Sequence, residues 1–428
     1  THGNLQNGLF KGNLTINDPN LAFNLEGEFN LSGAKNHYDL HGVVGRADLR
    51  ELGYLRDSLV VKTDLDVQLE GSKLDDIVGS AVFTDATRHR IMPLVAGALR
   101  SVATVPAEIA DRSGAIARRD GILSMVQAAE LCRIGEAFTK RGIDWITVKG
   151  PALALLAYGN VGAKASHDID LLIDPAARTD AFAAMQALGY VSLDGQDRAA
   201  PGSLDHVLKD SGWRHPGNRV MVELHTRLFI NRALVPELGI RSPRESVAFG
   251  AGRSLPTLAR PELLVYLAVH GASTNWHRLK WIADFAAVTA CSSDEQRAAA
   301  RACAARLGAG DIHDSALALA ATLFGDSACP PPRTFSPQAQ RLTQAGLRDL
   351  TAPHESTLRE VDWDRSIVVY LDKLRFMPDW AYRREELRLM LIESSSYTPD
   401  APWWRRWTAP IALAGRFARR KLAQAVSR

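Results

Sequence analysis

The sequence has few cysteines and no long apolar run. Its four cysteines form no C-x-x-C pair and match no zinc-module spacing, so we expect reduced thiols, most of them buried as small hydrophobic side chains. No apolar stretch approaches the roughly eighteen residues that cross a bilayer, and no signal peptide is recognisable, so neither a transmembrane helix nor a leader is predicted. Because the chain begins at Thr1 rather than Met, we expect a fragment or a processed product.

The chain also lacks a strong charge imbalance. Of its 428 residues, 46% are hydrophobic and 23% are charged, and a net charge of +3 selects no partner by itself. The total hides a division, because residues 1–88 carry 8 basic and 13 acidic side chains and the remainder carries 43 and 35. Asparagine usage changes as well, since eight of the twelve asparagines precede position 40. The length and this shift predict two or three domains.

Residues 1–88 alternate between apolar and polar side chains. In VVKTDLDVQLE, Leu65, Val67 and Leu69 share one strand face, and such runs are separated by glycine and asparagine. This pattern predicts about five or six antiparallel strands with one apolar and one solvated face. The GNLTINDPNL, LEGEFNLSG and GVVGRADLREL segments resemble AsmA-like translocation and assembly module repeats of bacterial envelopes, which implies a lipid-carrying groove. A small sheet without a separate function is the alternative.

From about residue 94 the apolar period becomes helical. Residues 122–142 are expected to form an amphipathic helix that ends at Gly142, with this apolar stripe: Ile122, Met125, Ala129, Cys132, Ile134 and Phe138. WITVKG, DIDLLID and RVMVELHTRL have the character of strands, and PALALLAYG and RTDAFAAMQALGY that of helices. We therefore predict an α+β fold with an antiparallel β segment (1–88), an α/β core (94–258) and a mostly helical lobe (259–428).

The stretch HDIDLLID places two carboxylates at the start of a buried strand. Asp168 and Asp170 are two residues apart, so they point to the same side, while Ile169 turns into the core. Carboxylates beside a core are costly unless a cation neutralises them. Mg²⁺ prefers hard oxygen ligands and takes a few carboxylates together with substrate phosphates. Glu223, in the strand-like VMVELH, is the candidate for a third ligand.

Several segments together resemble a known family. VKGPALALLAYG, ASHDIDLLID, ALGYV, VELHTRL and RLKWIADFA are similar to the uncharacterised nucleotidyltransferase family, a branch of the polymerase-β-like nucleotidyltransferases, over about residues 115–290. The resemblance implies that Asp168, Asp170 and Glu223 are the catalytic and metal-binding acids. It also implies Mg²⁺, with Mn²⁺ as an alternative, and transfer of a nucleotidyl group from a nucleoside triphosphate such as ATP. The acceptor would be a hydroxyl of a small molecule, a peptide or a protein.

The phosphate-binding part of the motif departs from the wider superfamily, which has Gly-Ser at a helix N-terminus. Here Pro151 follows Gly150, so the hydroxyl and one N–H are missing. Residues that can replace them or contact the nucleotide are Lys149, Gly150, Lys164 and His225. Their structural alternatives are a strand-end lysine, a turn glycine, a loop lysine and a hydrogen-bonded structural histidine.

A second group of residues is not expected to be catalytic. The segment around them is expected to form a helix, a break and a second helix. Neighbours among His270, His277 and Asp284 are seven residues apart, which is about 10 Å along a helix axis and too far for one zinc ion unless the chain bends between them. Asp284 is expected to pair with a nearby arginine or lysine. We expect Trp276 and Trp281 to belong to the core rather than to stack on a nucleobase.

The C-terminal segment APWWRRWTAPIALAGRFARRKLAQAVSR is basic and aromatic. We interpret it as a solvated helix, with contact to a membrane surface as the alternative; nucleic acid is not an expected partner. Residues 94–428 are expected in the cytoplasm, with envelope association if the β segment belongs to the same protein; a chimeric reading frame is the alternative. Two rivals to an enzyme remain: a scaffold on a degenerate transferase fold, and an envelope lipid-binding module.

Overall fold

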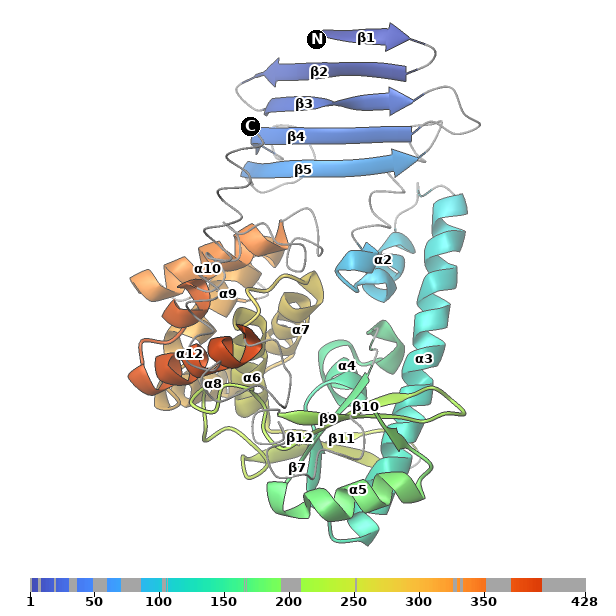
Figure 1. Cartoon of the computed structure of the whole chain (residues 1–428), viewed down its shortest axis with the longest axis vertical. Helices are drawn as coiled ribbons and strands as arrows, with labels where there is room; N and C mark the ends of the chain where they lie inside the picture. Colours follow the sequence, from blue (N-terminus) through green and yellow to red (C-terminus); the bar gives the residue numbers. More distant parts are fainter. Residues whose placement is uncertain are drawn as a thin grey trace.

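The structure is a computed structural model, and it confirms the predicted α+β class (Figure 1). It describes residues 2–6, 9–18, 21–30, 37–48, 60–70, 86–101, 105, 107–164, 166, 168–193, 209–250, 252–325, 329–331, 334–351 and 371–394. The basic and aromatic C-terminal segment, residues 401–428, lies outside the described residues.

The N-terminal segment forms a five-stranded antiparallel sheet, which confirms the prediction from alternation. Its strands pair in the order of the sequence: β1 (His2–Gln6), β2 (Leu9–Asn17), β3 (Leu21–Asn30), β4 (His37–Asp48) and β5 (Val60–Glu70). β4 shifts register against both of its neighbours at the same place, between Val44 and Ala47. Such shifts are typical of β-bulges, which bend and twist a sheet. Figure 1 shows this sheet at one end of the view.

A second sheet lies at the centre of the remaining chain, and it is mixed rather than purely antiparallel. Its spatial order is β6 (Trp145–Thr147), β7 (Asp168–Ile173), β10 (Met221–His225), β9 (Asp210–Arg214) and β8 (Val191–Ser192). β7 and β10 run parallel, and the other neighbours are antiparallel. β7 is buried from Ile169 onward, which explains its uninterrupted apolar run. The sequence analysis found β6, β7 and β10 but missed β8 and β9.

The helices predicted beside this sheet occur in the predicted order as α3 (Ala107–Lys140), α4 (Gly150–Tyr158) and α5 (Arg178–Ala187), although α3 begins earlier than expected. The helix α2 (Met92–Leu99) precedes them and was not predicted, and the short 3-10 turns are η1 (Val161–Ala163) and η2 (Pro175–Ala177). A hairpin of β11 (Arg244–Ala248) and β12 (Ser254–Leu258) precedes the helical lobe. Two glycines end helices as predicted, because Gly142 and Gly189 adopt positive φ angles of 69° and 85°.

The predicted buried face of α3 is partly wrong. Ile122 and Met125 are 66% and 55% exposed, whereas Ser124 and Gln127 are 4% and 6% exposed. The physical reason is a polar contact: the Ser124 hydroxyl donates to the carbonyl of residue 164 at 2.8 Å, and the Gln127 amide donates to the carbonyl of residue 166 at 3.2 Å. The middle of the helix therefore supports the loop that leads into β7 rather than packing only apolar side chains.

From residue 260 the described chain is helical, as predicted. Its helices are α6 (Arg260–Ala272), α7 (Leu279–Ala290), α8 (Asp294–Arg306), α9 (Gly310–Phe324), α10 (Pro337–Leu350) and α12 (Trp380–Ser394). One hydrophobic cluster joins Ile146 and Leu153 of the central unit to Leu263 and Ile282 of this lobe, across the predicted boundary at residues 258 and 259. The α4 helix thus packs against the helical lobe rather than facing solvent.

Trp276 lies in this shared core with 1% of its surface exposed, which confirms its predicted place. Gly271 permits the close packing, because a Cβ atom there would lie 1.9 Å from the Trp276 ring. Trp281 is partly buried against the same core.

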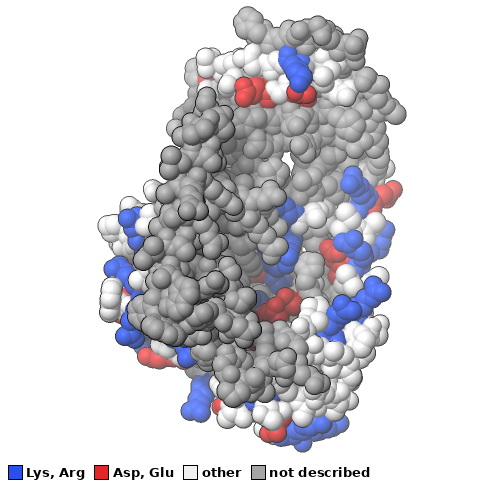
Figure 2. All heavy atoms as spheres, viewed as in Figure 1, with Lys and Arg blue, Asp and Glu red and all other residues white. Residues whose placement is uncertain are grey.

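The cysteines and the surface charge of the described residues agree with the sequence. All four cysteines are free thiols, and Cys132, Cys303 and Cys329 are buried, as expected. On the face drawn in Figure 2, basic and acidic side chains are interspersed, in agreement with the small net charge. No helix among the described residues is long and apolar enough to cross a membrane.

Candidate active site

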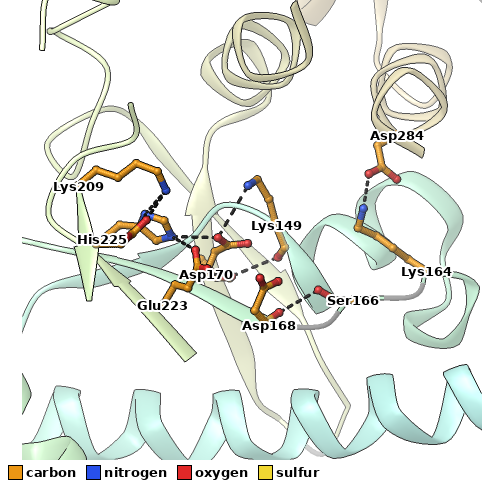
Figure 3. Close-up of polar contacts among 11 residues, drawn as sticks. Lys149, Lys164, Ser166, Asp168, Asp170, Lys209, Glu223, His225 and Asp284 are labelled. Carbon is orange, nitrogen blue, oxygen red and sulfur yellow. Dashed lines mark hydrogen bonds and ion pairs between the residues drawn. The ribbon is translucent and has the colours of Figure 1, made fainter. Parts of the chain in front are cut away.

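Three acidic residues gather where β7 and β10 run side by side. The parallel register pairs Glu223 with Asp170 and Met221 with Asp168. Side chains of paired residues lie on one face of a sheet, and residues i and i+2 share that face, so all three carboxylates lie on the same side. Figure 3 shows the side chains of Asp168, Asp170 and Glu223 close to one another. The structure therefore places Glu223, the predicted third acid, beside the aspartate pair.

Asp168 lies at the rim of this group and its charge is unfavourable there. Burial raises the pKa of the Asp168 carboxyl, and the negative charges of Asp170 and Glu223 raise it further. The hydroxyl of Ser166 donates a hydrogen bond to the Asp168 backbone carbonyl at 2.8 Å, which fixes the start of the strand. Like charges held together in this way favour the binding of a cation.

Asp170 is the most strongly held of the acids. It is 5% exposed, its Oδ1 atom lies 2.9 Å from Nε2 of His225, and the Lys149 ammonium lies 3.8 Å from the same oxygen. Burial alone would raise the pKa of Asp170, but Lys149, His225 and Lys209 outweigh burial and hold this pKa well below its usual range. Asp170 therefore carries its negative charge throughout the physiological pH range.

His225 uses both ring nitrogens to position Asp170. On one side its Nε2 faces Asp170, and it also lies 3.4 Å from a carboxylate oxygen of Glu223. On the other side its Nδ1 lies 3.1 Å from the ammonium of Lys209, which can only donate. In a neutral ring, Nδ1 thus accepts and Nε2 donates. Burial by itself lowers the pKa of His225, but the hydrogen bonds to Asp170 and Glu223 raise it overall.

Lys149 and Gly150 lie at the turn between β6 and α4, and Figure 3 shows the Lys149 side chain next to Asp170. Gly150 has a φ of +61°, a conformation that side chains other than glycine adopt with strain, and open space surrounds the position of a Cβ atom. The Lys149 ammonium also lies 5.8 Å from the centre of the Tyr266 ring. Burial lowers the pKa of Lys149, but Asp170 raises it well above its usual range, so this lysine stays charged.

Lys164 has a different partner. Its buried ammonium forms an ion pair with Asp284 of α7, and the Tyr158 hydroxyl donates to the other oxygen of Asp284 at 3.0 Å. Figure 3 shows Lys164 directed toward α7 rather than toward the three acids. The expected pairing of Asp284 with a basic residue is confirmed, and the partner connects the loop before β7 to the helical lobe.

The sequence analysis missed three residues around the acids, and they come from distant segments. Lys209, which contacts His225, directly precedes β9, a strand that was not predicted. Tyr266, whose ring lies near the Lys149 ammonium, belongs to the apolar helix α6, where a tyrosine is expected to be an ordinary core residue. Lys280, in the first turn of α7, has a pKa lowered to about 7, first by burial and then by Lys164 and Arg90. The only sequence signal for Lys280 is its position within the RLKWIADFA segment.

The donor atoms fit a divalent cation. Oxygen or nitrogen atoms of Asp170, Glu223 and His225 all lie within 4.8 Å of one another. Because both nitrogens of His225 already make polar contacts, the carboxylates are the better ligands, with Asp168 beside them. An oxygen-rich site of this kind suits Mg²⁺, and an adjacent imidazole is also compatible with Mn²⁺.

The comparison with protein families agrees with this geometry. The model of the uncharacterised nucleotidyltransferase family matches residues 80–325. The chain belongs to the uncharacterised nucleotidyltransferase family. The matched segment contains the three acids, the Lys149–Gly150 turn and helices α6 to α9 of the helical lobe. No curated protein matches the chain.

The match does not extend to residues 1–79. The resemblance of the N-terminal sheet to AsmA-like repeats therefore remains a prediction from the sequence, as does the lipid-binding function that it implies.

Proposed function

We propose that this protein transfers a nucleotidyl group from a nucleoside triphosphate to a hydroxyl group of a small molecule, peptide or protein. The observation that carries the proposal is the register of β7 and β10, which sets Glu223 beside Asp170 and on the same face as Asp168. Membership of a nucleotidyltransferase family supports the reaction class. Mg²⁺ is the proposed cation, held by Asp168, Asp170 and Glu223, with Mn²⁺ as a substitute.

In the proposed reaction the acceptor oxygen forms a bond to the α-phosphorus, and the bond from that phosphorus to the β-phosphate bridging oxygen breaks. Pyrophosphate leaves, and the hydroxyl proton is lost to the carboxylate group or to water. A bound divalent cation supplies charge to the phosphate oxygens and lowers the pKa of the attacking hydroxyl. Little further acid or base chemistry is needed, because phosphoryl transfer depends mainly on positioning and electrostatics.

The residues of the chain have distinct proposed parts in this scheme. Lys149 keeps its charge and can contact a phosphate oxygen once a cation takes over its partner Asp170. Gly150 leaves open space at the start of α4 for a phosphate to approach the backbone. His225 and Lys209 are positioning residues, since they hold the orientation of Asp170. Lys164 does not contact the acids in this scheme; its ion pair with Asp284 connects the loop before β7 to α7.

A scaffold on a degenerate transferase fold is the rival function. Pro151 at the first turn of α4 was its main support, since it removes an N–H group and a hydroxyl. The three acids share one face and Asp170 keeps its contact with Lys149, however, and like charges held together disfavour the folded state unless a ligand of opposite sign joins them. Nucleotidyl transfer is therefore the better explanation of the site.

The test is transfer of label from α-³²P-labelled ATP, GTP, CTP and UTP, each with Mg²⁺ or Mn²⁺ and a mixture of acceptors from cell extract. We expect labelled product with at least one nucleotide, together with pyrophosphate. Asp170→Asn should reduce the rate roughly a thousandfold, because a metal clamp supplies several kcal/mol of transition-state stabilisation.

Asp174→Asn is the matched control. Asp174 follows the opposite end of the same strand and caps a short turn, where its Oδ1 accepts the Ala176 N–H at 2.9 Å. Asparagine caps such a turn nearly as well, so the activity of this variant should equal that of the wild type. Absence of product with all four nucleotides, or equal rates for wild type and Asp170→Asn, would contradict the proposal.

A further inference from the structure

The solvent-facing side of α3 carries a group of apolar side chains in the middle of the helix. Their exposed fractions lie between 37% and 66%, and they are Ile122, Leu123, Met125 and Val126. The opposite side of the same segment is held by the hydrogen bonds of Ser124 and Gln127 to the loop before β7, so the helix cannot turn these side chains inward. Single exposed apolar residues are normal on a protein surface, but a contiguous group indicates an interaction site.

Two of these residues belong to an exposed stripe that repeats every seven positions. The stripe advances along α3 by three and four residues in turn, and its members are Arg112, Ala115, Arg119, Ile122, Val126, Ala129, Arg133 and Glu136. Arg133 is the partly buried member, because its guanidinium donates to Glu130 and to the carbonyl of Leu188. The other members are exposed. This spacing keeps the side chains in one line, and two helices commonly pack along such a line.

The apolar part of the stripe lies at the level of Ser124, with the charged part on either side. When two copies of α3 pack antiparallel with a two-fold axis at this level, residues at equal distances before and after Ser124 face each other. Ile122 of one copy then faces Val126 of the second copy, and the symmetry makes this contact twice. Leu123 and Met125 flank the contact and extend its apolar area.

The charges of the stripe fit the same antiparallel arrangement. Arg112, twelve residues before Ser124, faces Glu136 of the second copy, twelve residues after it. Arg119 and Arg133 face small alanine side chains, so no like charges meet within the stripe. A parallel pair would instead place each arginine against its own copy. The charges therefore favour a second copy of this chain in the antiparallel orientation.

The acid of this pair is able to accept another cation. A carboxylate oxygen of Glu136 lies 3.4 Å from Nε of Arg253, and both side chains are more than half exposed. A carboxylate has two oxygens and can accept several hydrogen bonds, so an arginine of a second copy can join Arg253 there.

We propose that the protein forms a homodimer through the middle of α3, with the two helices antiparallel about Ser124. This proposal is independent of nucleotidyl transfer. The dimer covers Ile122 and Met125, two side chains that the apolar pattern of the sequence predicts to be buried and that the single chain leaves exposed. It also covers the side of α3 that faces away from the loop before β7, so the acids stay on the opposite side of the helix from the contact.

The first test is sedimentation equilibrium of the full chain at concentrations from about 1 to 100 µM, a range in which a modest interface dissociates. We expect a reversible dimer. Ile122→Arg places a cation at the centre of the contact in both copies and should raise the dissociation constant by more than about tenfold. Leu323→Arg is the matched control, because Leu323 is 38% exposed in α9, and this variant should dimerise as the wild type does.

The second test is an exchange of charges at the outer contact. Arg112→Glu and Glu136→Arg each create two like-charge contacts in the dimer, and each should weaken it by about tenfold. The double variant Arg112→Glu/Glu136→Arg restores opposite charges and should recover most of the affinity. Arg301→Glu is the control for charge alone, because Arg301 is exposed in α8, and it should have no effect.

Three results would overturn the proposal. A wild type that stays monomeric throughout the range would show that a partner other than a second copy covers the face. A dimer that persists in Ile122→Arg would show that another surface joins the copies. Losses that add in the double charge variant, instead of cancelling, would contradict the antiparallel pairing of Arg112 with Glu136.

Discussion

The protein buries two groups of charged side chains, and they differ in balance. Both oxygens of Asp284 have direct partners, because one meets the Lys164 ammonium and the other accepts from the Tyr158 hydroxyl. Among the three acids, Lys149, His225 and Lys209 hold Asp170 in its charged form, whereas the charges of Asp170 and Glu223 raise the pKa of Asp168. A balanced pair can serve structure alone, because its charges satisfy each other. An excess of one sign is unfavourable in the protein by itself and indicates a ligand of the opposite sign.

The largest effect on stability should come from breaking the balanced pair. Lys164→Met leaves Asp284 buried without its cation, and we expect a loss of about 3 to 5 kcal/mol in the free energy of unfolding. The double variant Lys164→Met/Asp284→Asn removes both charges and should recover part of this loss. Urea unfolding of the three proteins measures both effects. A loss below about 0.5 kcal/mol for the single variant would show that the pair contributes little.

Removing a charge from the three acids should stabilise the protein rather than destabilise it. Asp168→Asn removes one of three like charges, so without divalent cations it should stabilise the protein at pH 7 by on the order of 1 kcal/mol. The sign follows from the pKa of Asp168, which is raised in the folded protein, so that its ionised form is disfavoured there.

The measurement for Asp168→Asn is thermal unfolding in EDTA and again with excess Mg²⁺. The metal should stabilise the wild type but not the variant, which reverses their order. If Asp168→Asn destabilises the protein in EDTA, the acids are not in electrostatic conflict and the comparison between the two groups fails.

The effect of Lys280 on stability depends on pH. The pKa of Lys280 is about 7 in the folded protein, below its ordinary value of 10.5. Between these values the unfolded chain binds more protons, so this group makes stability rise as pH increases from about 7 to 10.5. Lys280→Met should therefore be more stable than wild type by about 1 to 2 kcal/mol near pH 6, with the difference vanishing at high pH.

Denaturation of Lys280→Met and wild type at several pH values between 6 and about 10 checks this expectation. A variant that is less stable than wild type at every pH would show that Lys280 stabilises the fold and would contradict the expectation. Exposed Lys140→Met provides the baseline, since its removal should leave the pH profile unchanged.

The acid group could be predicted because its pattern is local. The spacing of Asp168 and Asp170 determines that they share a strand face, and the alternation around Glu223 shows that it also lies on a strand. The fold class and most elements of the central unit followed from the same periodicities. What the residues alone left open was which strand pairs with β7 and in which register.

The other contacts could not be read from the sequence because they join distant segments. Lys164 and Asp284 are separated by 120 positions, and neither has a local signal that names its partner. Lys209 was missed because β9 contains glycine and lacks a run of β-branched residues. The face of α3 was wrong because hydrogen bonds to a loop outweighed the apolar pattern at Ser124 and Gln127. The periodicity of apolar side chains predicts which face of an element is buried, but it does not predict hydrogen bonds or ion pairs with residues far away in the sequence.

The central claim is that Asp168, Asp170 and Glu223 together hold a divalent cation for nucleotidyl transfer. The most direct measurement is an electron paramagnetic resonance titration of Mn²⁺ into the wild type, Asp170→Asn and the control Asp174→Asn, with and without ATP. We predict that the free Mn²⁺ signal falls with wild type and with Asp174→Asn, and falls further with ATP, but that Asp170→Asn leaves most of the metal free. Equal Mn²⁺ binding by all three proteins, or none by the wild type even with ATP, would contradict the claim.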